Sequence, residues 1–178
     1  PQVRKYILDI ARYWVEQGID GWRLDVPFEI DDDSFWQEFR QVVKSANPDA
    51  YIVGEIPSEA QRWMAGDQFD AVMNYQLTHA ALGFFGGPRI DHELAFGMMG
   101  LPAPAELDAP TFAKRSTELL NIYPHDFAYA QLNLLDSHDM PRFLSLVKND
   151  VRRLELAYTF LFTYPGAPCV YYGDEIGL

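Results

Sequence analysis

The regular alternation of helical and strand-like segments is the feature that most limits which folds this chain can adopt. Five short apolar runs are separated by segments whose apolar residues recur at helical spacing. The order is helix–strand three times, a further helix followed by an irregular insert near 86–110, and helix–strand twice more. Near-continuous apolar runs are typical of parallel strands covered by helices. The sequence therefore predicts an α/β fold with a parallel sheet.

The pattern also indicates where each element lies. The expected helices are residues 2–17, 31–47, 58–65, 76–85, 111–121 and 151–161. The expected strands are residues 19–26, 50–56, 69–75, 127–135 and 167–172. About five βα units in this length match the repeat of a (β/α)₈ TIM barrel, with three strands absent. Two arrangements fit this pattern: an open five-stranded α/β sheet, or the C-terminal part of a barrel that is incomplete as a single domain over 1–178.

Composition narrows the classes of partner. The 178 residues carry a net charge of −12, which argues against nucleic acid and anionic membranes as partners. The single cysteine, Cys169, lies in an apolar run, so we expect it to be buried and inert, and no intrachain disulfide can form. The chain begins with Pro1 rather than Met, so we expect it to be a piece of a longer protein.

The stretch 18–29 combines apolar strand character with paired charges. Arg23 and Asp25 are two residues apart, so on a strand their side chains leave the same face. On a strand surrounded by apolar residues, two such charges are costly unless they pair or act on a ligand. We therefore favour a functional site over a structural ion pair here.

Further carboxylates follow other predicted strands. Glu55 ends the second strand, and His138 and Asp139 follow the fourth. In parallel α/β proteins, catalytic groups collect at the carboxyl ends of strands. Several carboxyl groups at one sheet edge are suited to glycoside hydrolysis. In that reaction one carboxylate attacks the anomeric carbon, and a second carboxyl group, kept protonated, gives its proton to the leaving oxygen. The apolar flank 52–54 favours a protonated Glu55, so we assign it the acid/base role.

These motifs resemble those of the α-amylase superfamily, glycoside hydrolase family 13. The Arg23-x-Asp25 pattern in 18–29 is similar to its fourth-strand motif, and 52–55 to its fifth-strand motif. Residues 134–139 resemble the seventh-strand motif, and 166–175 the eighth-strand segment. The stretch 66–75 looks most like the neopullulanase, cyclomaltodextrinase and maltogenic amylase branch. The resemblance thus implies a fragment spanning barrel strands four to eight.

The resemblance also implies a role for each site residue. Asp25 would be the catalytic nucleophile with Arg23 beside it, and Glu55 the general acid/base. His138 and Asp139 would contact sugar hydroxyls and stabilise the transition state, so Asp139 is the third catalytic carboxylate.

Arg142 lies three residues after Asp139. It could bind a sugar hydroxyl or cap a helix, and the sequence does not decide between the two. The family's third-strand Asn-His motif is not in this chain. Phe28 and residues 57–58 also differ from the residues that are common in the neopullulanase branch. In the family these positions border the leaving-group side of the cleft.

The function implied is that of a retaining glycoside hydrolase. Its substrates would be α-1,4 glucosidic bonds, with α-1,6 bonds as a second target, in starch-derived oligosaccharides, cyclodextrins or pullulan. It would proceed through a covalent glycosyl intermediate on Asp25. Two alternatives stay open at this point: an α-glucanosyltransferase of the same family, and a catalytically inactive carbohydrate-binding relative.

Further expectations concern cofactors, partners and location. We expect no cofactor and no metal site in this segment, since His79, His92 and His125 lack ligand spacing, whereas calcium could bind in the missing part. The full-length protein could form a homodimer, and the cytoplasm or periplasm is favoured over secretion with disulfides. We expect residues 1–178 alone to be unstable and inactive, because two strand edges would be left unpaired.

Overall fold

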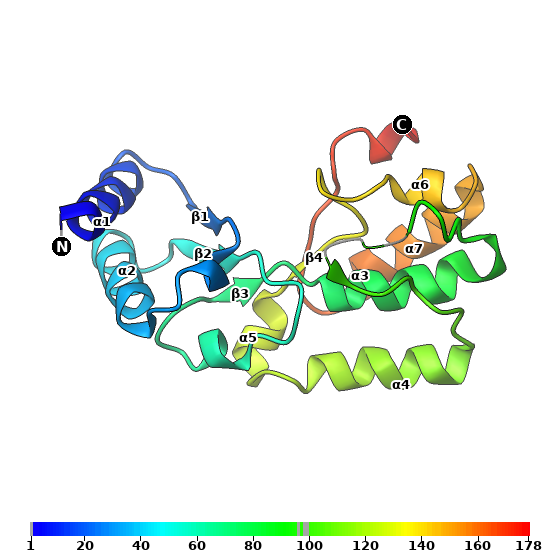
Figure 1. Ribbon diagram of the computed structural model, residues 1–178, viewed down its shortest axis with the longest axis horizontal. Coiled ribbons are helices and arrows are strands. Elements are labelled where there is room, and N and C mark those ends of the chain that lie inside the picture. The colour runs from blue at the N-terminus through cyan, green and yellow to red at the C-terminus, as the bar shows by residue number, and fades with distance from the viewer. Residues whose placement is uncertain (1, 96, 98–99) are drawn as a thin grey trace. The chain divides into compact units, whose positions relative to one another are not determined.

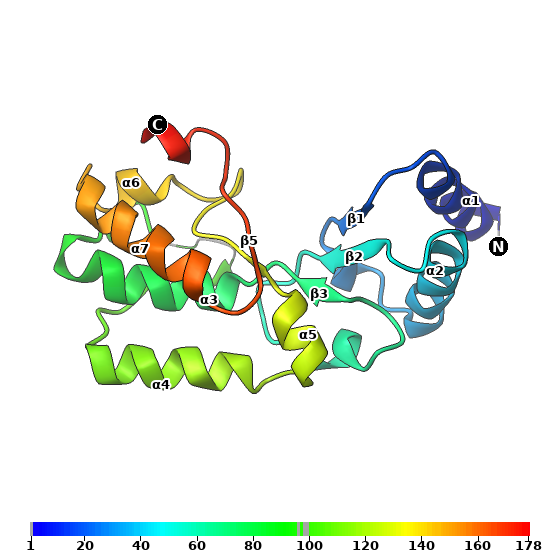
Figure 2. The ribbon, with the colours of Figure 1, turned by 180° about the vertical axis from the view of Figure 1, so that it is seen from behind.

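The computed structural model describes residues 2–95, 97 and 100–178. The chain divides into two compact units (Figures 1 and 2). The first unit runs to Ile56 and includes Ala60–Val72, and the second comprises Pro57–Glu59 and Met73–Leu178. Each unit contains parallel strands and helices, so the α/β class is confirmed.

The first unit is a three-stranded parallel sheet with two long helices. Its elements are α1 (Gln2–Glu16), β1 (Gly21–Leu24), the 3₁₀-helix η1 (Pro27–Glu29), α2 (Asp33–Ala46), β2 (Tyr51–Gly54), the 3₁₀-helix η2 (Gln61–Met64) and β3 (Ala71–Val72). The strand order is β1-β2-β3, with Leu24 opposite Gly54. The three expected strands are present but shorter than predicted. Where a helix was expected over 58–65, only the 3₁₀-helix η2 forms.

Helix α2 begins where the sequence predicts. The side chain of Asp32 accepts a hydrogen bond from the backbone N–H of Phe35 at 3.1 Å, a standard N-cap. The buried stripe Phe35, Phe39 and Val43 then faces the interior. Trp36 from the same helix meets the fully buried ring of Phe69 edge-on, with centroids 5.2 Å apart.

On helix α1 the apolar residues at helical spacing are Val3, Ile7, Ile10, Ala11 and Trp14, and the structure buries only part of this stripe. Val3, Ile7 and Trp14 are 71%, 37% and 48% exposed. Ala11 of the expected stripe is buried, and Leu8 and Val15 complete the buried face. Both faces carry apolar residues, so helical periodicity predicts the helix correctly but does not select the face that packs here.

The second unit is mainly helical around a short two-stranded parallel sheet. Its elements are α3 (Tyr75–Ala81), the π-helix η3 (Leu82–Gly86), the 3₁₀-helix η4 (Gly87–Arg89), α4 (Ala109–Leu120), α5 (His125–Ala130), β4 (Leu132–Asn133), α6 (Phe143–Leu146), α7 (Val151–Thr163), β5 (Ala167–Pro168) and the 3₁₀-helix η6 (Asp174–Ile176). Strands β4 and β5 pair in parallel, and Met73 bridges to Leu132. Helices α3 and α4 lie side by side (Figures 1 and 2). The core includes Leu82, Leu135, Phe143, Leu146, Ala157 and Leu161.

The strand predicted over 127–135 is wrong in its first half. Residues His125–Ala130 form helix α5, and only Leu132–Asn133 is strand. The side-chain amide nitrogen of Gln131 donates to the carbonyl of Phe127 at 2.7 Å and so caps the last helical turn, and Ala128 is buried. Residues 127–130 are all hydrophobic, so their pattern fits either structure, and tertiary packing decides in favour of the helix.

The last strand is also shorter than predicted. It spans Ala167–Pro168, after which the N–H of Cys169 still donates to the carbonyl of Asn133 at 2.7 Å. Cys169 is half-buried rather than fully buried, and burial raises the pKa of its thiol. A raised thiol pKa disfavours the thiolate, as expected for an inert cysteine. Helix α6 was not predicted.

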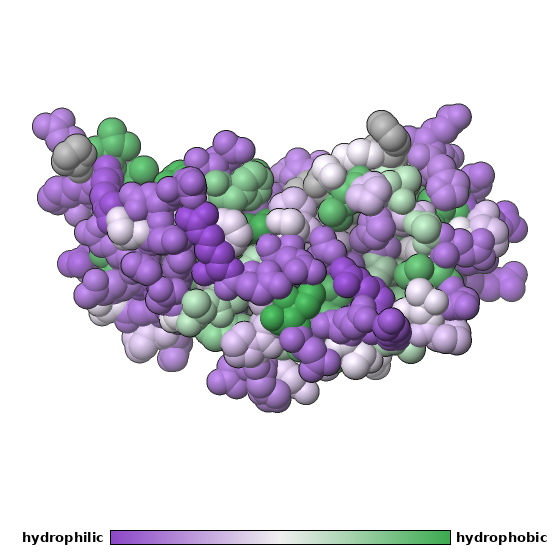
Figure 3. Space-filling model, turned by 60° about the horizontal axis from the view of Figure 1, so that its bottom comes forward, coloured by the Kyte–Doolittle hydropathy of each residue, from purple (hydrophilic) through white to green (hydrophobic). Residues whose placement is uncertain are grey.

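The insert near 86–110 begins with η4 and ends as α4 starts at Ala109. The described residues between these helices form turns and irregular chain, as predicted. Residues 96, 98 and 99, which the prediction also covers, lie outside the described part of the chain. Within that part, no helix has the length and apolar character needed to cross a membrane. Figure 3 shows a face of the molecule that is mostly hydrophilic.

Two strand edges are unpaired among the described residues. Strand β1 pairs only with β2, and β5 pairs only with β4. Apolar side chains are exposed near both ends of the chain, including Tyr172 at 69% and Ile176 at 77%. Unpaired N–H and C=O groups and exposed apolar surface both disfavour an independent fold.

We therefore expect residues 1–178, expressed alone, to lack a cooperative unfolding transition. Typical net stability is only about 5–15 kcal/mol, so missing strand partners are enough to abolish it. Thermal unfolding followed by circular dichroism, with the complete protein as control, tests this. A monomer with one sharp transition would contradict the expectation.

Asp70 links β2, β3 and α2 in the first unit. Its carboxylate accepts from Arg40 Nη1 at 2.7 Å, Lys44 Nζ at 2.8 Å and the N–H of Ile52 at 2.9 Å. Burial acts to raise the pKa of Asp70, but these hydrogen bonds outweigh it, so the pKa lies below its usual value of 3.8. Ionised Asp70 therefore contributes to the free energy of unfolding at pH values above 3.8. This contribution is lost as the pH falls through the lowered pKa of Asp70.

We expect Asp70→Asn to destabilise the complete protein by about 3 kcal/mol, because two cations lose their buried partner. The exposed Asp9, which pairs with Lys5 on α1, offers a matched control in Asp9→Asn. Apparent urea midpoints at pH 7 measure both variants. Equal midpoints would show that the Asp70 cluster contributes no net stability.

Candidate active site

The first group of site residues lies where β1 and β2 end. Strand register places Arg23 opposite Val53 and Leu24 opposite Gly54. The N–H of Glu55 donates to the carbonyl of Leu24 at 2.9 Å, which continues the parallel ladder. Asp25 and Glu55, each the next residue of its strand, therefore emerge at the same sheet edge.

Arg23 contacts both carboxylates. Its Nη1 atom lies 2.5 Å from Asp25 Oδ1, and its Nη2 atom contacts Glu55 Oε1. The planar guanidinium can serve two carboxylates at once through its fixed fork of donors. The predicted proximity of Arg23 to Asp25 is therefore seen, and Glu55 joins the same cluster.

The backbone around Glu55 is unusual. Val26 has φ 32° and ψ 54°, in the left-handed region that β-branched residues rarely occupy. In this conformation its N–H donates to Glu55 Oε2 at 3.3 Å, just before Pro27 starts η1. Gly54 is needed on the other strand, because a Cβ there would lie 2.9 Å from the ring of Phe69. Close packing thus holds the Glu55 carboxyl in place.

The two carboxylates differ in exposure. Glu55 is 2% exposed, whereas the side chain of Asp25 is 74% exposed and that of Arg23 is 32% exposed. The Asp25 side chain is therefore open to solvent. The reason is that, among the described residues, β1 is an edge strand without a neighbour on its outer side.

The second group follows β4 in the second unit. His138 Nε2 lies 3.0 Å from Asp139 Oδ2, and the N–H of Asp139 donates to Ser137 Oγ at 3.2 Å. The two side chains are 59% and 43% exposed, while Leu135 and Ser137 before them are buried. A buried segment thus presents His138 and Asp139 at its accessible end, as expected from their place after a strand.

Arg142 is held by the C-terminal segment. Its Nη1 atom lies 3.2 Å from Asp174 Oδ1 and also donates to the carbonyl of Tyr172. The guanidinium carbon lies 4.6 Å and 4.7 Å from the ring centroids of Tyr171 and Tyr172. Arg142 precedes α6 but makes no side-chain cap bond, so the helix-cap alternative is not observed. Its contact with sugar stays a prediction.

A buried carboxyl pair was not predicted. Asp136 is 2% exposed, and burial, followed by its hydrogen bond with Asp174, raises its pKa to about 7. The available signal was an acidic residue directly after the apolar 134–135. Beside Asp174, Glu175 Oε2 accepts a hydrogen bond from the N–H of Gly173 at 2.8 Å.

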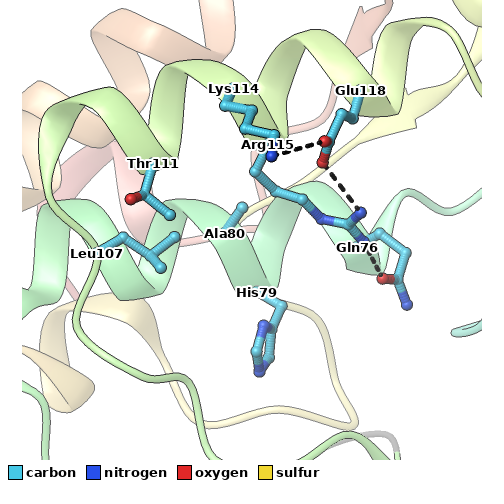
Figure 4. A pocket seen from close by; sticks show the side chains of 8 residues that line it. All are labelled: Gln76, His79, Ala80, Leu107, Thr111, Lys114, Arg115 and Glu118. Atoms are coloured by element: carbon cyan, nitrogen blue, oxygen red, sulfur yellow. Dashed lines mark hydrogen bonds and ion pairs between the residues drawn. The ribbon is translucent and has the colours of Figure 1, made fainter.

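One pocket of the second unit holds none of the six predicted residues. This pocket of about 270 Å³ lies between α3 and α4, where Arg115 donates to Gln76 and faces Glu118 (Figure 4). Its cations are thus already engaged by neighbouring groups. Among residues 2–95, 97 and 100–178, no three His, Cys, Asp or Glu side chains are grouped so as to hold a metal ion.

Comparison with curated proteins identifies close relatives. Cyclomaltodextrinase from Geobacillus thermopakistaniensis (strain MAS1) is 48% identical over 179 residues. Neopullulanase 2 from Thermoactinomyces vulgaris is 46% identical over 178 residues. Both alignments cover 100% of this chain but only 27% of the relative, so the chain spans about a quarter of the length of these proteins.

Solved structures match equally well. The acarbose-soaked debranching enzyme of Nostoc punctiforme superposes with a TM-score of 0.96 at 46% identity, covering 100% of this chain and 38% of that one. Cyclic α-maltosyl-(1→6)-maltose hydrolase from Arthrobacter globiformis gives a TM-score of 0.86 at 42% identity, covering 100% and 36%. The family described as "Alpha amylase, catalytic domain" matches residues 1–178. The chain therefore belongs to the α-amylase family and corresponds to part of its catalytic domain.

Proposed function

We propose that the protein containing this chain is a retaining glycoside hydrolase that cleaves α-glucosidic bonds. The observation that carries the proposal is the Arg23 guanidinium, which contacts Asp25 and Glu55 at the ends of adjacent parallel strands. A shared guanidinium keeps the two carboxyl groups close to each other. Closely spaced carboxyl groups are what the covalent, retaining route requires.

In the first step, Asp25 attacks the anomeric carbon and forms a glycosyl ester. Its exposed carboxylate is accessible to a sugar, and the contact with Arg23 Nη1 orients it. Glu55 gives its proton to the departing glycosidic oxygen, so the leaving sugar departs as a neutral alcohol. The buried site of Glu55 and the donors from Arg23 and Val26 fix its orientation for this transfer.

In the second step, Glu55 accepts a proton from water while the water oxygen attacks the anomeric carbon. The bond to Asp25 breaks, and the sugar is released with its original configuration. His138 and Asp139 bind sugar hydroxyls and stabilise the oxocarbenium-like transition state. Arg142 belongs to the same loop and is assigned to sugar binding with them.

We also propose that the chain supplies strands four to eight of an eight-stranded barrel. Its motifs occur in that order, every observed strand pairing is parallel, and the chain covers 38% of the Nostoc punctiforme structure it matches. The remaining strands, the Asn-His motif and any calcium site would belong to the part of the protein outside this chain.

The substrate class follows from the relatives. Proteins named cyclomaltodextrinase and neopullulanase align along the whole chain, which supports cyclodextrins, pullulan or starch-derived oligosaccharides with α-1,4 bonds as substrates. The A. globiformis relative is named a hydrolase of a cyclic maltosyl-(1→6)-maltose, which supports α-1,6 bonds as a further target. These names favour hydrolysis over glucanosyl transfer or an inactive relative.

Oligomeric state and location are proposed from the sequence alone. A homodimer of the full-length protein and a cytoplasmic or periplasmic location are compatible with a single cysteine and no intrachain disulfide.

We expect Asp25→Asn in the complete enzyme to lower turnover by a factor on the order of 10³ or more, because the amide cannot form the glycosyl ester. Oligosaccharide binding should stay measurable by calorimetry. The nearby Asp20→Asn, just before β1, is the matched control and should behave like the parent. Turnover of Asp25→Asn within about tenfold of the parent would exclude Asp25 as nucleophile.

We expect Glu55→Gln to lower turnover of natural glucans by about 10²–10⁴-fold, because their leaving groups need a proton. Formation of the glycosyl intermediate from an activated aryl glycoside needs no such proton and should be far less affected, as burst kinetics would reveal. Glu16→Gln at the end of α1 is the control. Equal losses on both kinds of substrate would assign the acid role to another residue.

A further inference from the structure

Four polar side chains meet inside the second unit, away from Asp25 and Glu55 in the sequence. They are Asp136 after β4, Arg142 before α6, Tyr158 on α7 and Asp174 in η6. The proposed reaction assigns no role to Asp136, Tyr158 or Asp174. Buried polar groups are costly unless all of them are satisfied, so their hydrogen bonds can be counted atom by atom.

Asp174 is the central acceptor of this cluster. Its side chain is 0% exposed, and its Oδ1 atom lies 3.2 Å from Arg142 Nη1. Its Oδ2 atom accepts a hydrogen bond from the hydroxyl of Tyr158. Burial and Asp174 raise the pKa of Tyr158, so the phenol stays neutral and keeps donating. Both oxygens of Asp174 thus have a donor.

Asp136 has a donor for one oxygen only. Its Oδ2 atom accepts from the N–H of Phe143 at 2.7 Å. Its Oδ1 atom is buried and has no donor among the described residues, and the Asp174 carboxyl lies within hydrogen-bonding reach of Asp136. Two carboxylates in contact cannot both ionise cheaply, whereas a proton between them satisfies the remaining oxygen.

The net charge of the cluster also favours one proton shared by Asp136 and Asp174. With both carboxylates ionised, Asp136 and Asp174 carry two negative charges against the one positive charge of Arg142. With one shared proton the buried cluster is neutral, which removes the main cost of placing it in the interior.

Asp136 also closes the loop that carries the second group of site residues. Its hydrogen bond to Phe143 joins the two ends of 137–142, the loop that contains His138, Asp139 and Arg142. Inside this loop, the N–H of Asp139 donates to Ser137 Oγ at 3.2 Å. Through Asp174, the same cluster ties the loop to the segment after β5.

We propose that Asp136 and Asp174 share one proton, and that Asp136 is thereby a positioning residue that fixes the Asp139 loop to the segment after β5. The functional half of this inference rests on the proposed role of Asp139. The shared proton itself does not depend on the reaction.

The titration of Asp136 agrees with this geometry. Burial, and then the hydrogen bond with Asp174, raises its pKa to about 7 from 3.8. The folded state therefore binds more protons than the unfolded state between these values, so stability falls as pH rises through that window. The other titratable groups that interact with this cluster are Arg142, Tyr158, Cys169, Tyr171 and Tyr172. None of these other groups loses its proton near neutral pH in its usual state.

Two variants of the complete enzyme distinguish the effect of ionising Asp136 from the effect of losing its hydrogen bonds. Asp136→Asn keeps a donor for Asp174 and an acceptor for Phe143 but cannot ionise. Asp136→Leu removes both hydrogen bonds. Asp126→Asn on α5, where the side chain is 100% exposed, is the matched control.

Activity is measured on an activated aryl α-glycoside, whose departure does not need the Glu55 proton. We expect the parent and the control to lose kcat as pH rises through 7, and Asp136→Asn to lose less. At pH 6, Asp136→Leu should lose at least about tenfold in kcat with KM within about threefold, because Asp139 is misplaced. The same alkaline loss in Asp136→Asn as in the parent, or equal kcat in the Asn and Leu variants, would overturn the positioning role.

The shared proton can also be observed directly in a protein that keeps Asp136, so this test does not depend on whether the Asp136 variants fold. In a Glu55→Gln background, the infrared carbonyl band of one protonated carboxylic acid should be present at pH 6 and disappear near pH 7. Absence of that band at pH 6 in the folded protein would overturn the shared proton. Because this measurement needs no turnover, it tests the proton even if the proposed hydrolase activity is not found.

Discussion

Parallel pairing of β1 with β2 is the constraint on which the first group of site residues depends. Its register sets Leu24 beside Gly54, so the next residue of each strand, Asp25 and Glu55, is delivered to one edge. A shift by one residue would turn the Arg23 side chain to the opposite face and break its contact with both carboxylates. Gly54 secures this arrangement, since only a residue without Cβ lets β2 approach the ring of Phe69.

The two units neutralise their carboxylates in different ways. In the first unit, one guanidinium serves both Asp25 and Glu55, and the exposed carboxylate remains available for a covalent bond with a ligand. In the second unit, Asp136 and Asp174 are both buried, and a proton joins the Arg142 charge in balancing them. Asp25 is therefore open to a ligand, whereas the buried Asp136 and Asp174 hold a loop in place.

Most of the architecture was predictable from local pattern. The helix beginning at Asp33 was expected from its acidic start and apolar stripe, and its N-cap is observed at Asp32. The pattern failed at 127–131, where α5 replaces a strand, and on α1, where Val3 and Trp14 are exposed. Both failures occur where a segment is apolar enough to satisfy two structures, so packing partners rather than periodicity decide.

The sequence by itself determined the chemistry at the strand ends: Arg23 two residues before Asp25, Glu55 after an apolar run, and His138 next to Asp139. Spacing along one strand is a local property, so it can be read without coordinates. Only the tertiary structure decided that Arg23 also contacts Glu55, that Arg142 is held by Asp174, and that Asp136 faces Asp174. Each of these contacts joins residues at least thirty positions apart in the chain, and such distances close only when strands pair and helices pack around a common core.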